Sequence, residues 1–110
     1  MPEQPRYSFF RLSKRIFSYE EATSVLPKVQ RMTASAVERV AELPEDDPAA
    51  YQEVVMEWAE SVIGLGIEVK GLWLIDFDSG GGYYCWRYPE PALEYFHGYE
   101  EGFGGRVKLN

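Results

Sequence analysis

The chain has 110 residues, of which 45% are hydrophobic and 26% are charged, and this is the size and composition of one ordinary globular domain. These values exclude a wholly disordered chain, and the net charge of −7 opposes nonspecific binding of nucleic acid, which depends on lysine and arginine. The single cysteine, Cys85, excludes an internal disulfide. Because no apolar run has the length of a membrane span and no apolar secretory signal is evident, we expect a cytoplasmic protein.

Residues 1–16 are predicted to form a basic and aromatic arm, followed by a single domain at 17–110. Prolines near its beginning keep the arm extended at that point. The pattern leaves open whether the rest is a strand or a tail that becomes ordered on contact. Binding of nucleic acid through this arm is the weakest hypothesis for the chain, although only one acid, Glu3, offsets its basic residues, Arg6, Arg11, Lys14 and Arg15.

The first helix is predicted to begin after Ser18. Ser18 and Glu21 form a capping box, in which each side chain bonds the backbone N–H of the other residue. Apolar residues then recur at helical spacing as far as Leu43, which indicates a helix with one buried face. Pro27 lies inside this pattern and is expected to kink the helix, because it removes a backbone hydrogen bond.

A second helix is predicted after a short acidic connection at residues 44–48. Asp47 is a suitable N-cap and Pro48 suits the first helical position. Gly64 and Gly66 are stop signals at its far end. Two amphipathic helices joined by so short a link indicate an antiparallel helical hairpin.

The remainder of the chain has the pattern of a small β-meander. Residues 92–97 fit either a strand or a short helix, and we favour the strand, whereas 98–110 are glycine-rich and expected to be irregular. The expected segments are strands at 67–77, 83–88 and 92–97, joined by turns at 78–82 and 89–91. The predicted fold class is therefore α+β, with a two-helix antiparallel hairpin packed on an antiparallel β-meander of about three strands.

Both faces of this sheet are predicted to be apolar. The simplest symmetric register places on one face Trp73, Ile75, Phe77, Tyr83, Cys85, Arg87, Leu93, Tyr95 and His97. It places on the other face Leu72, Leu74, Asp76, Tyr84, Trp86, Tyr88, Ala92, Glu94 and Phe96. Two helices cover one face only, and the aromatic fraction of 15% is high. We therefore expect a homodimer, with the arm or an unidentified protein partner as the other candidates for covering the second face.

His97, the only histidine, is the first candidate for chemistry, because its ordinary pKa suits proton transfer at neutral pH. A pair with Cys85 is the minimum for a thiol nucleophile. The alternative interpretation is structural: His97 forms a hydrogen bond within the core or an interface, and Cys85 is a small buried hydrophobic residue. No fixed local motif favours catalysis, so no catalytic residue and no cofactor is assigned.

Metal and anion sites are weaker alternatives. A structural zinc site takes four cysteine or histidine ligands, whereas the chain has one cysteine and one histidine, so no metal site is assigned. The carboxylates that are available to complete a metal site with His97 are those of Glu94, Glu100 and Glu101. Charges within strands are normally paired, which favours a structural ion pair of Asp76 and Arg87 within the dimer over anion recognition by Arg87 and Arg106. The candidate functional cluster comprises Asp76, Cys85, Arg87, His97 and Arg106.

Residues 15–109 resemble the uncharacterised bacterial family known as domain of unknown function 2203. The residues that carry the resemblance are Phe17, Ser18, Glu21, Ala22, Leu26, Pro27, Gly66 to Lys70, Asp76, Phe77, Cys85, Trp86, Arg87, Glu90, Pro91, His97, Gly102, Phe103, Gly105 and Arg106. The chain departs from the family pattern at Pro89, Phe96 and Gly98. The resemblance implies no activity, but it suggests a shared role for Cys85, Arg87, His97 and Arg106.

Two functions of different classes are therefore weighed. The leading prediction is a noncatalytic, homodimeric interaction or regulatory module. The alternative is a protein that binds a small molecule, an anion or a metal around Arg87, His97 and Arg106, with an enzyme as one form of this alternative.

Overall fold

The computed structural model describes residues 15–109 of the chain. Nearly all of the predicted arm, residues 1–14, lies outside the described residues, as does residue 110.

The first described helix, α2, spans Tyr19–Ala41. The predicted capping box is present: the Glu21 N–H donates to Ser18 Oγ at 3.0 Å, and the Ser18 N–H donates to Glu21 Oε1 at 2.9 Å. The helix continues through Pro27. Its apolar face is buried, as the spacing predicts, at Ala22, Leu26, Val29 and Ala36.

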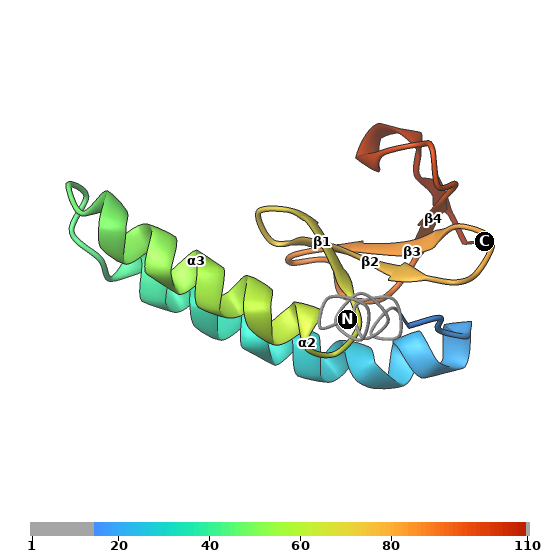
Figure 1. Ribbon diagram of the computed structural model, residues 1–110, viewed down its shortest axis with the longest axis horizontal. Helices are drawn as coiled ribbons and strands as arrows, with labels where there is room; N and C mark the ends of the chain where they lie inside the picture. Colours follow the sequence, from blue (N-terminus) through green and yellow to red (C-terminus); the bar gives the residue numbers. More distant parts are fainter. Residues whose placement is uncertain (1–14, 110) are drawn as a thin grey trace, which may run out of the picture.

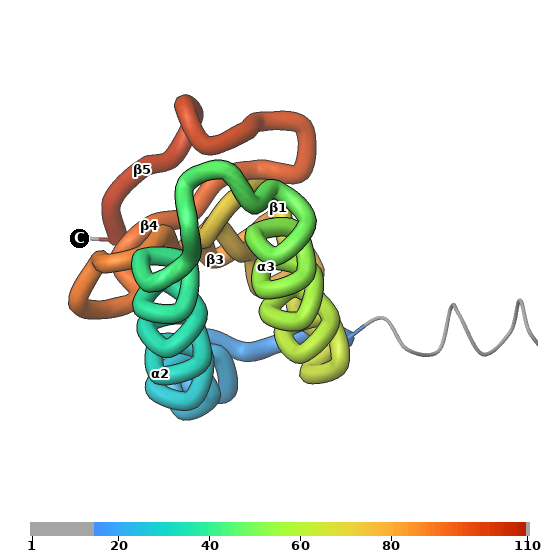
Figure 2. Tube along the Cα trace, turned by 90° about the vertical axis from the view of Figure 1, so that its left-hand side faces the viewer, coloured from blue at the N-terminus to red at the C-terminus, as the bar shows by residue number. Residues whose placement is uncertain are grey.

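The second helix, α3, spans Pro48–Ile63 and begins at the predicted N-cap, where Asp47 Oδ1 accepts from the Ala50 N–H at 3.1 Å. Figures 1 and 2 show α2 and α3 lying side by side as the expected antiparallel hairpin. Among the described residues, no helix combines the length and the apolar character that crossing a membrane requires.

The rest of the chain forms one antiparallel sheet whose strands lie in chain order. Its strands are β1 Glu68–Gly71, β2 Leu74–Asp78, β3 Tyr83–Arg87, β4 Tyr95–His97 and β5 Val107–Lys108. The predicted α+β class, a helical hairpin with a β-meander, is confirmed. The described sheet has five strands, however, where about three were expected.

One extra strand arises because residues 67–77 are not a single strand. The chain turns at Leu72 and Trp73, which separates β1 from β2. Trp73 adopts a positive φ of 60°, a conformation that bulky residues rarely adopt. Its indole packs edge-on against Trp58 of α3, with ring centroids 4.8 Å apart, and this tertiary contact offsets the strain.

The other extra strand is β5, which lies in the segment expected to be irregular. Two residues are too few to show a period, and β5 forms by pairing with β4, Phe96 opposite Val107. A short 3₁₀ helix, η1, precedes it at Phe103–Gly105. Within 92–97 the predicted strand is limited to Tyr95–His97.

The register between β2 and β3 differs by one residue from the symmetric one. Asp78 belongs to β2 and pairs with Tyr83, so that the turn is shorter than the five residues expected. The Asp78 carboxylate accepts from the Gly80 N–H at 2.9 Å, which explains why Asp78 ends the strand. A shift of one residue moves every side chain of a strand to the other face, and Asp76 therefore faces the same side as Cys85.

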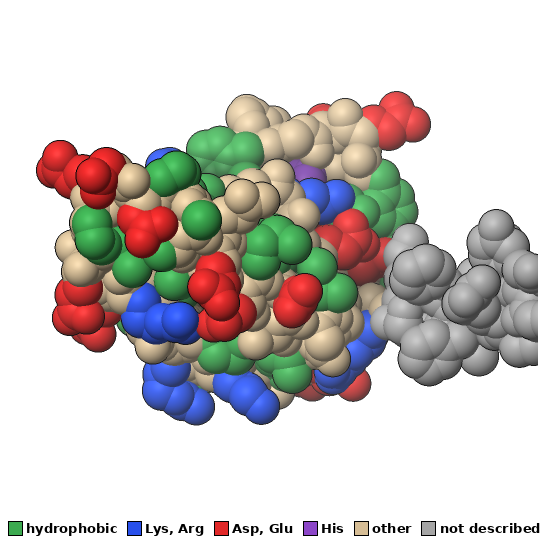
Figure 3. Space-filling view, turned by 60° about the vertical axis from the view of Figure 1, so that its left-hand side comes forward, with side chains coloured by type: hydrophobic (Ala, Val, Ile, Leu, Met, Phe, Trp, Pro, Cys, Tyr) green, Lys and Arg blue, Asp and Glu red, His purple; other side chains and the backbone are tan. Residues whose placement is uncertain are grey.

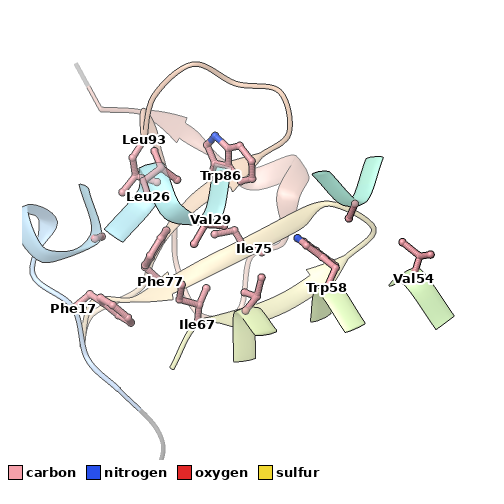
Figure 4. Close-up of a cluster of buried hydrophobic side chains, with 13 residues drawn as sticks. Phe17, Leu26, Val29, Val54, Trp58, Ile67, Ile75, Phe77, Trp86 and Leu93 are labelled. Carbon is pink, nitrogen blue, oxygen red and sulfur yellow. The ribbon is translucent and has the colours of Figure 1, made fainter. Parts of the chain in front are cut away.

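The helical hairpin covers one face of this sheet. Figure 4 shows the buried side chains between the helices and the strands, with Leu26 and Val29 from α2, Trp58 from α3, and Ile75 and Phe77 from β2. Burial of apolar side chains stabilises a fold by about 1.5–3 kcal/mol each, so this layer holds the hairpin and the sheet together.

The opposite face carries polar and charged side chains, and the prediction of two apolar faces was wrong. The strand register places on it Glu68, Leu74, Asp76, Asp78, Tyr83, Cys85, Arg87, Tyr95, His97 and Lys108. The reason is the one-residue shift described above, which turns acidic side chains of β2 to this side. A second apolar face therefore no longer supports the homodimer, which stays a prediction.

Candidate functional site

Three neighbouring strands bring together the residues of the candidate site on the polar face. Asp76 of β2 is opposite Cys85 of β3. His97 of β4 is opposite Tyr83, two residues before Cys85 along β3. Directly opposed residues of an antiparallel pair project to one side of the sheet, so Asp76, Cys85 and His97 converge.

Both ring nitrogens of His97 have partners. Nδ1 lies 2.8 Å from the carbonyl oxygen of Gly98, and Nε2 lies 2.9 Å from Asp76 Oδ2. A carbonyl oxygen only accepts hydrogen bonds, so Nδ1 carries a proton and donates it. The ring orientation is therefore set by the backbone, with Nε2 directed at the carboxyl group.

Asp76 is a buried acid, with 1% of its surface exposed. Its Oδ2 contacts His97, whereas Oδ1 is buried with no N–H or O–H donor among the described residues. Burial raises the pKa of the carboxyl group, and interactions with the Cys85 thiol and with His97 oppose this rise. A buried acceptor without a donor is costly, and it identifies this carboxyl group as a place where a further partner would be stabilising.

Cys85 is a protonated thiol at neutral pH. Burial, followed by the nearby Asp76 carboxyl group, raises its pKa to about 12, although Arg106 acts in the opposite direction. A nucleophilic cysteine needs a lowered pKa or an adjacent base. Since both nitrogens of His97 are engaged elsewhere, the geometry does not favour the thiol nucleophile considered from the sequence.

Together, Asp76, Cys85 and His97 form a compact set of possible metal ligands. One carboxylate oxygen, the thiol sulfur and one imidazole nitrogen all lie within 4.8 Å of one another, and all three residues are buried. Oxygen, sulfur and imidazole nitrogen are the ligand atoms of zinc sites. The acids expected to complete a site with His97, namely Glu94, Glu100 and Glu101, are not part of this set.

Arg106 reaches the same cluster from the segment between η1 and β5. Its Nη1 and Nη2 lie 3.1 and 2.8 Å from the two carboxylate oxygens of Glu90, and Nη1 lies 3.9 Å from Cys85 Sγ. The guanidinium is also stacked on the rings of Tyr95 at 3.9 Å and Phe103 at 4.0 Å. An arginine so engaged is poorly placed to take an external anion.

Arg87 lies apart from the other predicted site residues. It is exposed, and its guanidinium carbon lies 5.4 Å from the centre of the Phe103 ring. Among the described residues of the single chain, Arg87 forms no ion pair with Asp76, which pairs with His97; the ion pair expected within a dimer stays a prediction. The structure therefore brings together Asp76, Cys85, His97 and Arg106, and places Arg87 at the margin.

A cavity of about 420 Å³ opens above the cluster. The segment after β4 covers it with Tyr99, Glu100, Glu101 and Phe103, and the strands contribute Lys70 and Tyr83. A small area of histidine surface, purple in Figure 3, is visible beside basic atoms drawn in blue. The cavity gives a small molecule or water room next to the cluster.

Sequence reasoning missed the wall residues Lys70, Tyr83 and Tyr99. Lys70 belongs to one of the segments that carry the family resemblance, which was the available signal. Its Nζ lies 3.0 Å from Glu68 Oε1, which also accepts from the Tyr83 hydroxyl at 3.0 Å. No sequence pattern pointed to Tyr99, because its position depends on a hydrogen bond from its hydroxyl to Oδ1 of the distant residue Asp78, at 2.6 Å.

A model of the family described as uncharacterized conserved protein (DUF2203) matches residues 44–109. The match includes α3, the whole sheet and every residue of the candidate cluster. No curated protein and no solved structure matches the chain.

Proposed function

The chain belongs to the family of uncharacterized conserved proteins matched above, and we propose that it binds a divalent transition metal, zinc or one of similar chemistry, through Asp76, Cys85 and His97. The observation that carries this proposal is the convergence of their three ligand atoms within 4.8 Å on the polar face of the sheet. The residues come from three neighbouring strands of one hydrogen-bonded sheet, which fixes their relative positions.

The hydrogen bond of His97 to Gly98 supports the proposal. Histidines that bind metals usually donate their second ring N–H to a carbonyl or carboxylate, which fixes the tautomer and the ring orientation. Here Nδ1 donates to the Gly98 carbonyl oxygen at 2.8 Å. The Nε2 atom is the nitrogen directed into the cluster, and a metal would take the place of its present hydrogen bond to Asp76 Oδ2.

The charges of the three ligands also suit a divalent cation. An ionised Asp76 and a Cys85 thiolate balance two positive charges, with a neutral His97 as the third ligand. Metal coordination deprotonates a thiol outright, which overcomes its raised pKa of about 12. The ion would also provide a partner for the buried Asp76 Oδ1.

The spacing requires only small adjustments. Zinc bonds of about 2.0–2.3 Å in a tetrahedron place ligand atoms roughly 3.3–3.8 Å apart. The distance of 2.9 Å between His97 Nε2 and Asp76 Oδ2 has to lengthen slightly, and the wider separations from the Cys85 sulfur, within 4.8 Å, have to shorten by up to about 1.3 Å. Side-chain rotation provides such changes without moving the strands.

Three protein ligands leave the fourth position of a tetrahedral metal open. Structural zinc sites have four protein ligands, whereas catalytic sites have three and keep the fourth position for water or substrate. The cavity above the cluster gives that position access to a small molecule. The proposed site therefore has the ligand count of a reactive centre.

Cobalt(II) titration of the reduced, metal-free protein tests the proposal. We expect one equivalent to bind, with the visible absorption of tetrahedral cobalt and a near-ultraviolet charge-transfer band from thiolate to metal. The chain has one cysteine and one histidine, so a thiolate band arises from Cys85 alone. Addition of zinc should abolish both signals by displacement.

Cys85→Ser is the decisive variant, because it preserves the shape of the side chain. It should lose the charge-transfer band and most of the affinity, whereas Ser61→Ala, an exposed change in α3, should bind as the original chain does. If the original chain shows no tetrahedral cobalt spectrum, or if Cys85→Ser shows the same one, the proposed site is wrong.

We propose, as a second candidate, the homodimeric interaction module. Met56 and Ile63 are 50% and 57% exposed, and seven residues apart they share one face of α3. Because both side chains are exposed, this face of α3 is accessible to a partner. Light scattering on a sizing column tests this: a mass near twice 12.7 kDa supports the dimer, and a clean monomer overturns it.

A further inference from the structure

We propose that Arg106 is a positioning residue for the metal: it donates to the sulfur of Cys85 and thereby makes the site selective for metals that bind thiolate. This inference rests on the proposed function, since it concerns the same site. It assigns to Arg106 a role different from the anion binding considered from the sequence.

The geometry of the guanidinium supports this role. Arginine presents its N–H donors in a planar fork that matches a carboxylate. The Glu90 carboxylate takes up one edge of the fork, at 2.8 and 3.1 Å. Nη1 also lies 3.9 Å from Cys85 Sγ, so the fork points at the sulfur as well as at the carboxylate.

Arg106 is held in this position from several sides. Its guanidinium lies between the rings of Tyr95 and Phe103, at 3.9 and 4.0 Å from their centres. Glu90 is itself fixed, because its Oε1 accepts from the Arg87 N–H at 2.9 Å. A donor fixed in this way loses little conformational entropy when the thiol becomes a thiolate.

The positive charge of Arg106 lies next to the Cys85 sulfur, which is the ligand that separates thiolate-binding metals from hard cations. A thiolate is a soft ligand that suits zinc and cobalt, whereas magnesium and manganese prefer oxygen ligands. Hydrogen bonds to an ionised acceptor are about twice as strong as neutral ones, so the contact should strengthen when Cys85 loses its proton to a metal. Arg106 therefore favours thiolate-binding metals over hard cations.

The test compares Arg106→Met with Arg106→Lys in the full chain, with Arg87→Met as the matched control. Arg87 also lies near the Phe103 ring, at 5.4 Å, but among the described residues the guanidinium that bonds the Cys85 sulfur is that of Arg106. The readouts are the cobalt dissociation constant, measured by competition with a chelator, and the energy of the thiolate-to-cobalt band. A merely structural role of Arg106 would not move that band.

We expect Arg106→Met to weaken cobalt binding about 10–100-fold, the usual cost of removing a group that supports a metal ligand, and to shift the band. Arg106→Lys should recover part of the affinity, because it keeps the charge without the planar fork. Arg87→Met should match the original chain in both readouts.

Three results overturn the inference. If Arg106→Met binds cobalt with unchanged affinity and band, Arg106 has no role at the metal and the proposed site stands. If Arg87→Met has the same effect as Arg106→Met, the effect is not specific to the contact with sulfur. If the original chain binds no cobalt, both the site and this role are wrong.

A second variant covers the case in which Arg106→Met does not fold because Glu90 is left unpaired. Arg106→Met combined with Glu90→Gln also removes the negative charge of Glu90, which would otherwise be left unpaired. It should still bind cobalt more weakly and with a shifted band, and a normal band in this double variant overturns the proposal.

Discussion

His97 Nε2 lies 2.9 Å from Asp76 Oδ2, although the two residues are on β4 and β2 and β3 runs between them. Both are buried, with 4% and 1% of their surfaces exposed. Since His97 Nδ1 donates to the Gly98 carbonyl oxygen, the proton between Nε2 and the carboxyl group completes the hydrogen bonding of the ring. This pair joins β2 to β4 across β3 on the polar face, so we expect it to stabilise the metal-free fold.

Replacing His97 should destabilise the metal-free protein. His97→Ala leaves the Asp76 carboxyl group buried without its imidazole partner, and leaving a buried hydrogen-bonding group unsatisfied costs about 1–3 kcal/mol. Urea unfolding in the presence of a chelator measures the loss. The double variant Asp76→Asn with His97→Gln keeps neutral hydrogen-bonding groups, so it should be less destabilised than His97→Ala. If His97→Ala is as stable as the original chain, this prediction is wrong.

Stability should fall at alkaline pH because of Cys85. Its folded pKa of about 12 is above the ordinary value of 9.0, so between these values the unfolded chain has lost a proton that the folded chain keeps. The free energy of unfolding therefore decreases as pH rises from about 9 toward about 12, by up to about 1.4 kcal/mol per pH unit.

Denaturant unfolding of the metal-free protein across this pH range, with Cys85→Ala as the reference, isolates the effect of Cys85. Tyrosines also ionise in this range, and burial raises the pKa of Tyr83, but they contribute to both proteins. The difference in stability between the two proteins should change with pH. A constant difference would show that the thiol is not shifted.

Gly82 should tolerate no side chain. Its φ of 157° is unfavourable for other residues, and a Cβ there would meet the Phe96 ring and, at 2.8 Å, the carbonyl oxygen of His97. Gly82→Ala should thus destabilise the protein by about 2 kcal/mol or more. Gly81→Ala is the matched control, because a Cβ at that position meets nothing within 4 Å.

Thermal unfolding of the two glycine variants measures this difference. Similar melting temperatures would mean that the turn adapts. A large loss in Gly82→Ala alone would show that the close approach of the turn to β4 is needed for the fold around His97.

Thr33 should stabilise the helical hairpin by a buried hydrogen bond. The Trp58 indole N–H donates to Thr33 Oγ1 at 2.8 Å, and this bond joins α3 to α2. Thr33→Val keeps the shape but leaves the indole donor unpaired, which should cost about 1–3 kcal/mol. Thr23→Val, an exposed change in the same helix, should change the free energy of unfolding by less than about 0.5 kcal/mol.

The helices could be predicted from the sequence because their signals are local. The bonds that begin α2 join Ser18 to Glu21, and the bond that begins α3 joins Asp47 to Ala50. In each case the partners are three residues apart, within reach of one another before any tertiary structure exists. The apolar spacing of α2 likewise reports the one face that becomes buried.

The residues of the site were identified in part from the sequence, but their arrangement was not. Asp76, Cys85, His97 and Arg106 were all candidates, and the structure brings them together. The metal-ligand set escaped prediction because the expected register turned Asp76 away from Cys85. Arg87 was included because it lies in the same motif, yet its side chain is exposed.

The sequence by itself determined the two helices, their caps and the α+β class, since these depend on contacts between near neighbours. Only the tertiary structure decided the register of β2 on β3, the turn at Trp73 and the return of Arg106 to Cys85. Each of these depends on residues distant in the chain. A shift of one residue is nearly invisible in an apolar pattern, but it reverses the face of a strand, and here it decides that Asp76 faces the same side as Cys85.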